Sequence, residues 1–293
     1  MATYTNVNNE IFAQAAIEGL TKMLLPFTKF ARNFSPSQGQ KGDQVLVPLI
    51  STLTATTFSA YNVCGGTKTV ATVNLTKNRI VQVGQNDIDY HASSEADLKS
   101  FGNQMGAALG TICIQDILGL VTTANFASVA AVNIVDFDTV ELRAARLALN
   151  KADVPKDMRI ALVEADPYDN LLSVTNFVQA YMFKDSGVLQ EGRIMRALGM
   201  DFYEINALFT AAASIAAFCA YPDAIAVAMR YKAPQEGHKY NAAYSLSDAA
   251  SGIVAGFRDH YDENTGVRFM NLESLMGYTV GLTNCGRIIK RAD

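Results

Sequence analysis

Charged residues are scarce in this sequence, where Asp, Glu, Lys and Arg together make up 18% of 293 residues. Soluble domains usually carry about a quarter. Hydrophobic residues, at 49%, are ample for one large core or two smaller ones. So few charges on a chain of this size indicate that much of its surface is covered, and copies of the same chain are the simplest cover. The net charge of −4 argues against nucleic-acid binding through phosphate neutralisation, but allows a protein that only encloses nucleic acid.

Cysteine is also rare, and its positions favour no disulfide framework or metal site. The four cysteines are far apart and form no CxxC pair: Cys64, Cys113, Cys219 and Cys285. We expect reduced, mostly buried thiols. The sequence MATYTNVNNEIF at the N-terminus lacks the charged and apolar regions of a signal peptide. The most apolar long segment, residues 208–220, is too short to span a bilayer, so we expect a soluble intracellular product.

The common motifs of catalytic and nucleotide-binding sites are missing from the sequence. It contains no GxSxG elbow, HExxH motif, Walker-type glycine loop or GxGxxG after a strand. None of the three histidines, His91, His238 and His260, has a catalytic or ligand neighbourhood. The residues Asp259, Asp262 and Asn264 near His260 do not have the spacing of a calcium loop, and a hairpin turn needs the same residues. We therefore predict no catalytic residue, no metal site and no cofactor.

The strongest pattern that is present predicts a long helix over residues 93–125. Ser93 or Ser94 is a good N-cap. Apolar residues then follow at three- and four-residue steps: Leu98, Phe101, Met105, Leu109, Ile112, Ile117 and Val121. About 28 helical residues would span roughly 42 Å, long enough to act as a spine for smaller elements. Three glycines at four-residue spacing, Gly102, Gly106 and Gly110, form a smooth stripe where another backbone can approach, and ordinary close packing explains them.

Two segments of different character precede this spine helix. Residues 1–40 contain a helix with one apolar side, which Pro26 and the cluster at residues 35–39 end. We expect that apolar side to dock elsewhere, on a neighbouring subunit. Residues 41–91 hold two strands, at 44–49 and 69–83, joined by a Thr-rich stretch with almost no charge. This pattern predicts a protruding hairpin arm, although the stretch alone could equally be a flexible loop.

The chain after the spine helix alternates helices and strands before it becomes β-rich. A helix at 139–151 capped by Asp138, a buried strand at 159–163 and a helix starting at Asp166 predict one compact α/β unit. The segment Asp262–Gly266 is a strong hairpin turn between two later strands. Two further strands are expected at 272–282 and 287–290.

This order of parts resembles the major capsid proteins of tailed phages, which have the Hong Kong 97-type fold. Three segments carry the resemblance. KGDQVLVPL, at 41–49, is similar to the strand entering the extended loop of that family. FDTVELRAARLALNKADVPKDMRIALVEADPYDNLLS, at 137–173, is similar to the opening of the axial domain. GRIMRALGMDFYEIN, at 192–206, is similar to a loop followed by a strand in the same domain.

The resemblance implies an α+β chain of the Hong Kong 97-type capsid fold with five consecutive parts. They are an N-terminal arm (1–40), an extended loop with a β-hairpin (41–91), a peripheral domain with the spine helix (92–136), an axial domain (137–250) and the C-terminal strands of the peripheral domain (251–293). The family's occasional Lys–Asn crosslink has no marked counterpart, because nothing distinguishes Lys68 or Lys77 in the loop as reactive.

The same resemblance implies a structural virion protein that assembles as hexamers and pentamers into an icosahedral shell around double-stranded DNA. Its partners would be itself, a portal and, in some shells, a decoration protein, with DNA enclosed without sequence-specific binding and no membrane. Because the sequence starts directly with the arm, a separate scaffolding protein is implied, or a processed form renumbered. Assembly would take place in the host cytoplasm.

Two other functions are compatible with the sequence. An encapsulin-like compartment shares the fold and encloses cargo enzymes instead of DNA. An unfamiliar α/β enzyme is the other alternative, and it would require Asp166, Tyr168 or His260 to converge in one pocket. Only the three-dimensional arrangement of these residues separates the enzyme from a shell protein.

Overall fold

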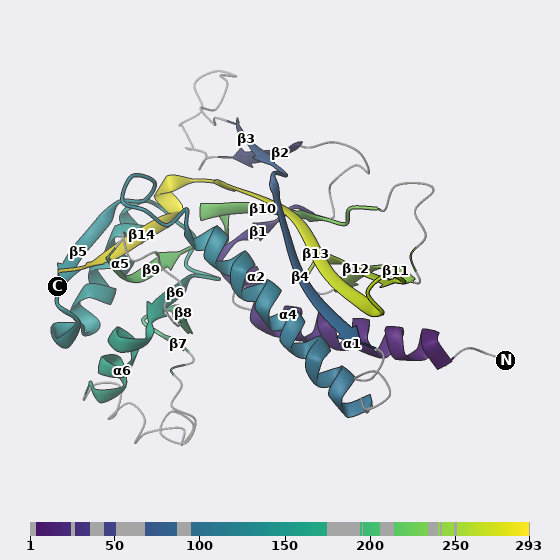
Figure 1. Ribbon diagram of the computed structural model, residues 1–293. Coiled ribbons are helices and arrows are strands. Elements are labelled where there is room, and N and C mark those ends of the chain that lie inside the picture. The colour runs from purple at the N-terminus through teal and green to yellow at the C-terminus, as the bar shows by residue number, and fades with distance from the viewer. Residues whose placement is uncertain are drawn as a thin grey trace.

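The computed structural model combines three β-sheets with helices packed on the two larger sheets (Figure 1). It describes residues 4–24, 27–35, 44–50, 68–86, 95–174, 194, 196–205, 214–233, 240, 242–248 and 251–292. Within these ranges the chain forms two six-stranded sheets and a two-stranded sheet. The predicted α+β class is confirmed.

The first sheet is built around one long strand near the C-terminus. Its strands, in spatial order, are β1 (Arg32–Asn33), β10 (Ile225–Arg230), β13 (Val267–Val280), β12 (Ile253–Asp262) and β11 (Ala242–Asp248), with β4 (Lys77–Asn86) also on β13. Residues 267–273 of β13 pair with both β12 and β4, so these two strands lie on opposite edges of β13. Asp262 accepts hydrogen bonds from the Asn264 amide and the Thr265 hydroxyl, which confirms the predicted hairpin turn between β12 and β13.

The second sheet contains the predicted compact α/β unit. Its strands, in order, are β5 (Ser128–Val132), β14 (Gly286–Arg291), β9 (Ile215–Ala220), β6 (Ile160–Glu164), β8 (Met200–Ile205) and β7 (Arg196–Ala197). Every residue of β9 is buried, as a central strand covered on both faces requires. Two helices pack on this sheet, α5 (Thr139–Lys151) and α6 (Ala165–Ser173). Asp138 caps α5 through a capping box with Glu141, which confirms the predicted helix start.

Each of the two large sheets takes strands from distant parts of the chain. β10 lies within residues 137–250 but pairs with β13 in the first sheet. β14 lies within residues 251–293 but pairs with β9 and β5 in the second sheet. Strand pairing over such sequence distances depends on tertiary packing, which no local pattern encodes. Three short 3-10 turns connect consecutive elements. They are η2 (Ile134–Asp136) between β5 and α5, η4 (Pro222–Ala224) between β9 and β10, and η5 (Thr283–Cys285) between β13 and β14.

The predicted spine helix is α4, Glu95–Leu118, and it is shorter than predicted. The expectation that it reaches residue 125 is wrong. After Leu118 the chain forms successive turns, in one of which the Phe126 amide donates to the Thr122 carbonyl. The apolar residues that continue the helical spacing after Leu118 therefore lie in turns and not in a helix. Ser93 and Ser94 lie outside the described residues.

Two helices at the N-terminus, α1 (Tyr4–Leu24) and α2 (Phe27–Phe30), join the main core. α1 packs along α4 and also contacts β11 and β12 (Figure 1). The buried side chains of these two helices include Phe12, Leu20, Leu24, Phe27 and Phe30. The expectation that this helix docks its apolar side on a neighbouring subunit is therefore wrong, because the chain's own spine helix covers that side.

The predicted hairpin arm begins with β2 (Gln44–Ile50) and β3 (Lys68–Asn74), which form an antiparallel pair. β4 follows β3 after only Leu75 and Thr76 and runs into the first sheet. The hairpin stands above the body of the molecule in Figure 1. The strand predicted at 44–49 is confirmed as β2, whereas the single strand predicted at 69–83 is two strands, β3 and β4, of which only β3 belongs to the hairpin. The Thr-rich stretch at 51–67 lies outside the described residues.

Candidate assembly surfaces

The glycine stripe of α4 determines how closely α1 approaches it. A Cβ atom added to Gly106 would lie 2.1 Å from the Ala16 carbonyl oxygen, and one added to Gly102 would lie 2.8 Å from the Phe12 carbonyl oxygen. From the other helix, a Cβ on Gly19 would lie 2.3 Å from the Asn103 carbonyl oxygen. Real Cβ atoms do not approach so closely, so these positions require glycine. The prediction of close backbone packing at the stripe is confirmed, and the partner is α1.

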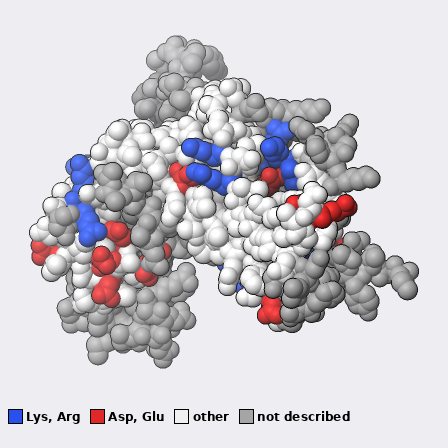
Figure 2. Space-filling model, in the orientation of Figure 1, with Lys and Arg blue, Asp and Glu red and all other residues white. Residues whose placement is uncertain are grey.

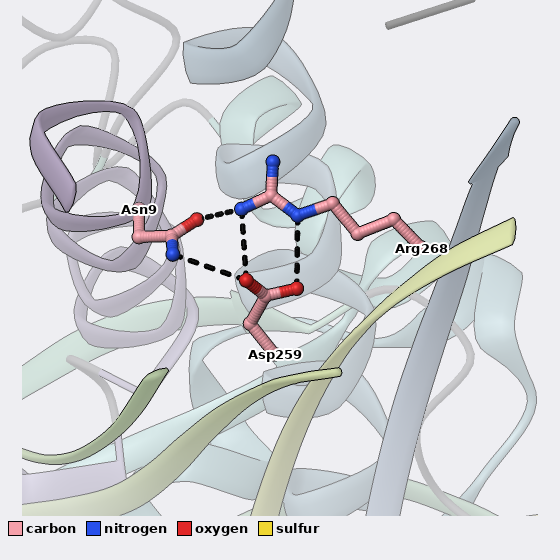
Figure 3. A network of polar contacts seen from close by, with 3 residues as sticks. All are labelled: Asn9, Asp259 and Arg268. Carbon is pink, nitrogen blue, oxygen red and sulfur yellow. Dashed lines mark hydrogen bonds and ion pairs between the residues drawn. The ribbon is translucent and has the colours of Figure 1, made fainter. Parts of the chain in front are cut away.

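A buried polar cluster fixes α1 to the β12–β13 hairpin (Figure 3). Arg268 donates from Nε to Asp259 Oδ1 and from Nη2 to Asp259 Oδ2, both at 2.9 Å. Asn9 donates to Asp259 Oδ2 at 3.0 Å and accepts a bond from Arg268. Asp259 is completely buried, so its charge depends on these partners. No local pattern indicates this cluster, because Asn9 lies 250 residues before Asp259 in the sequence.

The hairpin formed by β2 and β3 has one covered face and one open face. Val45, Val47 and Val73 point inward and pack against Ala226 and Ala228 of β10. The side chains on the opposite face alternate with them, as expected for strands. On that face Leu46 is 66% exposed and Val70 is 50% exposed, and the exposed Pro48 pairs with Val70. The open face is therefore an apolar surface with no cover among the described residues.

An ion pair ties the base of this hairpin to the spine helix. Arg79 of β4 binds Asp116 of α4 through two hydrogen bonds, at 2.6 and 2.7 Å. The hydrogen bond and the charge of Asp116 both raise the pKa of Arg79. Lys77, two residues earlier, is exposed, and nothing in its surroundings tests the idea of a crosslink. The pair holds β4 against α4, so the hairpin starts from a fixed base.

The side chains named for an enzyme do not converge. Tyr168 is buried in α6, where its hydroxyl accepts a hydrogen bond from the Ile194 amide at 2.7 Å. Asp166, in the first turn of the same helix, is 70% exposed at its side chain and does not cap it. His260 lies on β12 in the other sheet, stacked on Phe269 at 5.3 Å. Because His260 lies in a different sheet from the helix that carries Asp166 and Tyr168, these three side chains do not form the common pocket that an enzyme would need.

The cysteines that the structure describes are unsuited to redox or nucleophilic chemistry. Cys113, Cys219 and Cys285 are buried and free, as predicted, whereas Cys64 lies outside the described residues. Burial raises the pKa of Cys113 and of Cys219 to about 12, and that of Cys285 to about 11. Nucleophilic attack requires the thiolate, so these thiols are inert near neutral pH.

Charge is sparse on the surface as well as in the sequence. In Figure 2 the described part of the face is mostly uncharged, and its Lys, Arg, Asp and Glu side chains lie in small groups. Among the described residues, no helix is long and apolar enough to cross a membrane. The molecule therefore presents apolar and neutral polar surfaces for contact rather than a strongly charged one.

Comparison with known proteins identifies the architecture. Residues 104–232 match the model of a family described as phage capsid protein. A solved structure titled "Cyanophage Pam1 capsid asymmetric unit" superposes with a TM-score of 0.59 at 13% identity, over 92% of this chain and 92% of that chain. The chain has the Hong Kong 97-type capsid fold. The "Capsid structure of the Cyanophage P-SCSP1u" gives the same TM-score at 14% identity, over 91% of this chain and 87% of that chain.

The comparisons cover most of the segments on which the resemblance to capsid proteins was based. A structure titled "Mycobacterium phage Che8" also matches, with a TM-score of 0.56 and 15% identity over 85% of each chain. No curated protein sequence matches the chain. The family match covers two of the three segments that carried the resemblance, 137–173 and 192–206, whereas 41–49 lies before it. The resemblance to tailed-phage capsid proteins is thus confirmed.

Proposed function

We propose that this chain is a major capsid protein of a tailed phage, which assembles as hexamers and pentamers into an icosahedral shell around double-stranded DNA. The observation that carries this proposal is the match to a phage capsid structure over 92% of both chains. The scarcity of charge, at 18% of residues, also supports repeated contacts between identical chains. The described fold, without a converging set of catalytic residues, favours a structural role.

The shell forms because each copy buries apolar and hydrogen-bonding surface of its neighbours. The open face of the β2–β3 hairpin, with Leu46, Pro48 and Val70, is the part of the described chain best suited to lie on a neighbour. Its inner face already packs on β10, so the hairpin is held in place before contact. Holding it in place lowers the entropy lost on assembly.

The proposed partners follow from the same role. DNA is enclosed without sequence-specific binding, which agrees with a net charge of −4 and with the small charge groups in Figure 2. A separate scaffolding protein, a portal and a decoration protein complete the proposed particle, which assembles in the host cytoplasm and becomes the virion shell. The phage titles of the solved structures favour this role over an encapsulin-like compartment.

Negative-stain electron microscopy with light scattering tests this function. The chain, produced with its scaffolding protein, is expected to give closed particles. The variant Leu46→Asp/Val70→Asp is expected to give free capsomers or monomers, because it places charge on the hairpin's apolar face. Ser245→Asp/Ser247→Asp, on exposed positions of β11, adds the same charge and is the matched control. Normal shells from the hairpin variant would contradict the hairpin's role, and a monomer under all conditions would contradict the function.

A further inference from the structure

Helix α5 carries an apolar and basic surface that the fold leaves open. Leu142, Ala145 and Leu149 are buried against the second sheet. On the opposite side of the helix, Val140 is 58% exposed and Leu147 is 53% exposed. An open hollow of about 550 Å³ runs along this side, lined by Val140, Arg143, Ala144, Arg146, Leu147 and Asn150. We call this surface the α5 face.

The α5 face carries two arginine side chains that have no ion-pair partner among the described residues. These two side chains, Arg143 and Arg146, are exposed. Arg146 lies close enough to the buried Arg159 to lower the pKa of Arg159, after the larger effect of burial. The face therefore combines two exposed apolar side chains with unpaired cations, and an apolar partner surface carrying carboxylates would satisfy both.

Such a surface lies on the same lobe, at η2 and α6. Asn170 of α6 donates a hydrogen bond to the Ile134 carbonyl of η2 at 2.5 Å, which joins the two elements. Val135 is 85% exposed, and the neighbouring Asp136 of η2 and Asp169 of α6 are also exposed. Neither η2 nor α6 contains a Lys or Arg residue. We call this surface the η2–α6 face, and its centre is apolar with acidic groups around it.

Two of the carboxylates near this face are already paired. Arg291 at the end of β14 pairs with Glu164 at 3.2 Å and reaches Asp166 at 4.0 Å. Asp136 and Asp169 have no ion-pair partner among the described residues.

We propose that the α5 face of one copy binds the η2–α6 face of a second copy of this chain. Within one chain α5 packs mainly on β5 and β14 while α6 packs on β6 and β8, so the two helices lie over different strands of the second sheet. A head-to-tail arrangement of copies satisfies this contact between unlike faces, and repeating it closes a ring when the rotation between copies permits. This inference rests on the proposed function and names the contact within its hexamers and pentamers.

In this interface apolar contact supplies the binding free energy, and charge determines which faces pair. Val135, Val140 and Leu147 supply the apolar area that leaves water. Each exposed ion pair alone contributes little. Complementary charge instead selects the pairing of unlike faces, because two α5 faces or two η2–α6 faces would repel each other. Charge thereby directs copies into head-to-tail order.

Charge reversal tests the proposal, with wild-type particles as the reference. Arg143→Glu/Arg146→Glu makes the α5 face acidic, and Asp136→Lys/Asp169→Lys makes the η2–α6 face basic. Each variant alone is expected to lose at least about tenfold in assembly at 0.1 M salt, with part of the loss recovered at 1 M salt, where charges are screened. Lys22→Glu/Lys29→Glu, on exposed positions of α1 and α2, changes charge by the same amount as the arginine variant and is expected to assemble normally. Circular dichroism melting checks that every variant folds.

Two combinations separate direct pairing from a general charge effect. A chain carrying both reversals again presents opposite charges at every contact, so it is expected to assemble like the wild type. An equimolar mixture of the two single-face variants is expected to form alternating rings. Such rings are complete only with an even number of copies, so hexamers recover and pentamers do not, as particle images and native mass spectrometry would show.

Three outcomes bear on the proposal in different ways. Normal assembly of either single-face variant at low salt would overturn the contact while leaving the proposed function intact. Failure of both the double reversal and the mixture to restore assembly would also overturn it, since direct pairing requires rescue. Absence of particles from the wild type and the Lys22/Lys29 control alike would contradict the proposed function, and this contact with it.

Discussion

The buried cluster of Asn9, Asp259 and Arg268 gives the sharpest test of how α1 is held. The change Asp259→Ala removes a carboxylate that is completely buried and that accepts three hydrogen bonds. It breaks the ion pair with the Arg268 guanidinium, whose side chain is only 11% exposed. Breaking a buried ion pair by deleting one partner typically costs about 3–5 kcal/mol. This is a large part of a total stability of roughly 5–15 kcal/mol.

Urea unfolding followed by circular dichroism measures this loss in the free energy of unfolding. At roughly 2–4 °C per kcal/mol, the melting temperature is expected to fall by about 10 °C. Glu263→Ala, on the exposed turn of the same hairpin, is the control and should change stability by less than about 0.5 kcal/mol. The variant Asn9→Leu/Asp259→Leu/Arg268→Met, which replaces the whole cluster by apolar groups, should recover much of the loss. A cost below about 1 kcal/mol for Asp259→Ala would refute the reasoning.

Three further predictions concern the spine helix, the hairpin base and the thiols. Gly106→Ala should destabilise the chain by about 1–3 kcal/mol, because the new methyl group displaces α1, whereas the exposed Ala108→Ser should have almost no effect in the same urea assay. Arg79→Ala should cost about 1 kcal/mol, and a double-mutant cycle with Asp116→Ala should show that most of this is their mutual interaction. In a Cys64→Ser background the native chain should not react with a thiol reagent at pH 8, and it should expose three thiols when unfolded. Unfolded thiols ionise near pH ~8.5 while the buried ones stay protonated to higher pH, so stability should fall as pH rises above about 9.

Local patterns predicted the elements of this fold well. The apolar period located α4, the Asp138 capping box located the start of α5, and the Asp262 turn located the β12–β13 hairpin. In each case neighbouring residues supply the whole signal, because a helix repeats every 3.6 residues and a turn spans four. The resemblance to capsid proteins then supplied the order in which these elements assemble.

The errors arose where distant parts of the chain decide the outcome. The docking site of α1 depends on glycines about 90 positions later, and the sequence showed the stripe without its partner. The position of β14 in the second sheet depends on pairing with β9, which is about 70 residues earlier. The end of α4 was placed too late because Val121 continues the apolar period after the helix has ended. Periodicity reports that a residue is buried and does not report in which conformation.

The sequence could not reveal the candidate contact surfaces for a physical reason. Leu46, Val70, Val140 and Leu147 look like core residues in a list of hydrophobic positions, and only the structure shows that they are exposed. Their exposure is informative because the charged residues that normally cover such positions are scarce here, at 18% of the chain. The surfaces proposed for assembly are therefore the places where the hydrophobic pattern predicts a buried side chain and the structure shows an exposed one.

A cryo-electron microscopy reconstruction of particles assembled from the wild-type chain tests the central claim most directly. The expected result is a closed shell of rings of six and five copies, in which Leu46 and Val70 of each hairpin lie against a neighbouring copy. Closed shells with these side chains facing solvent would contradict the role given to the hairpin. A chain that forms no closed particle, even with its scaffolding protein, would contradict the claim that it is a capsid protein.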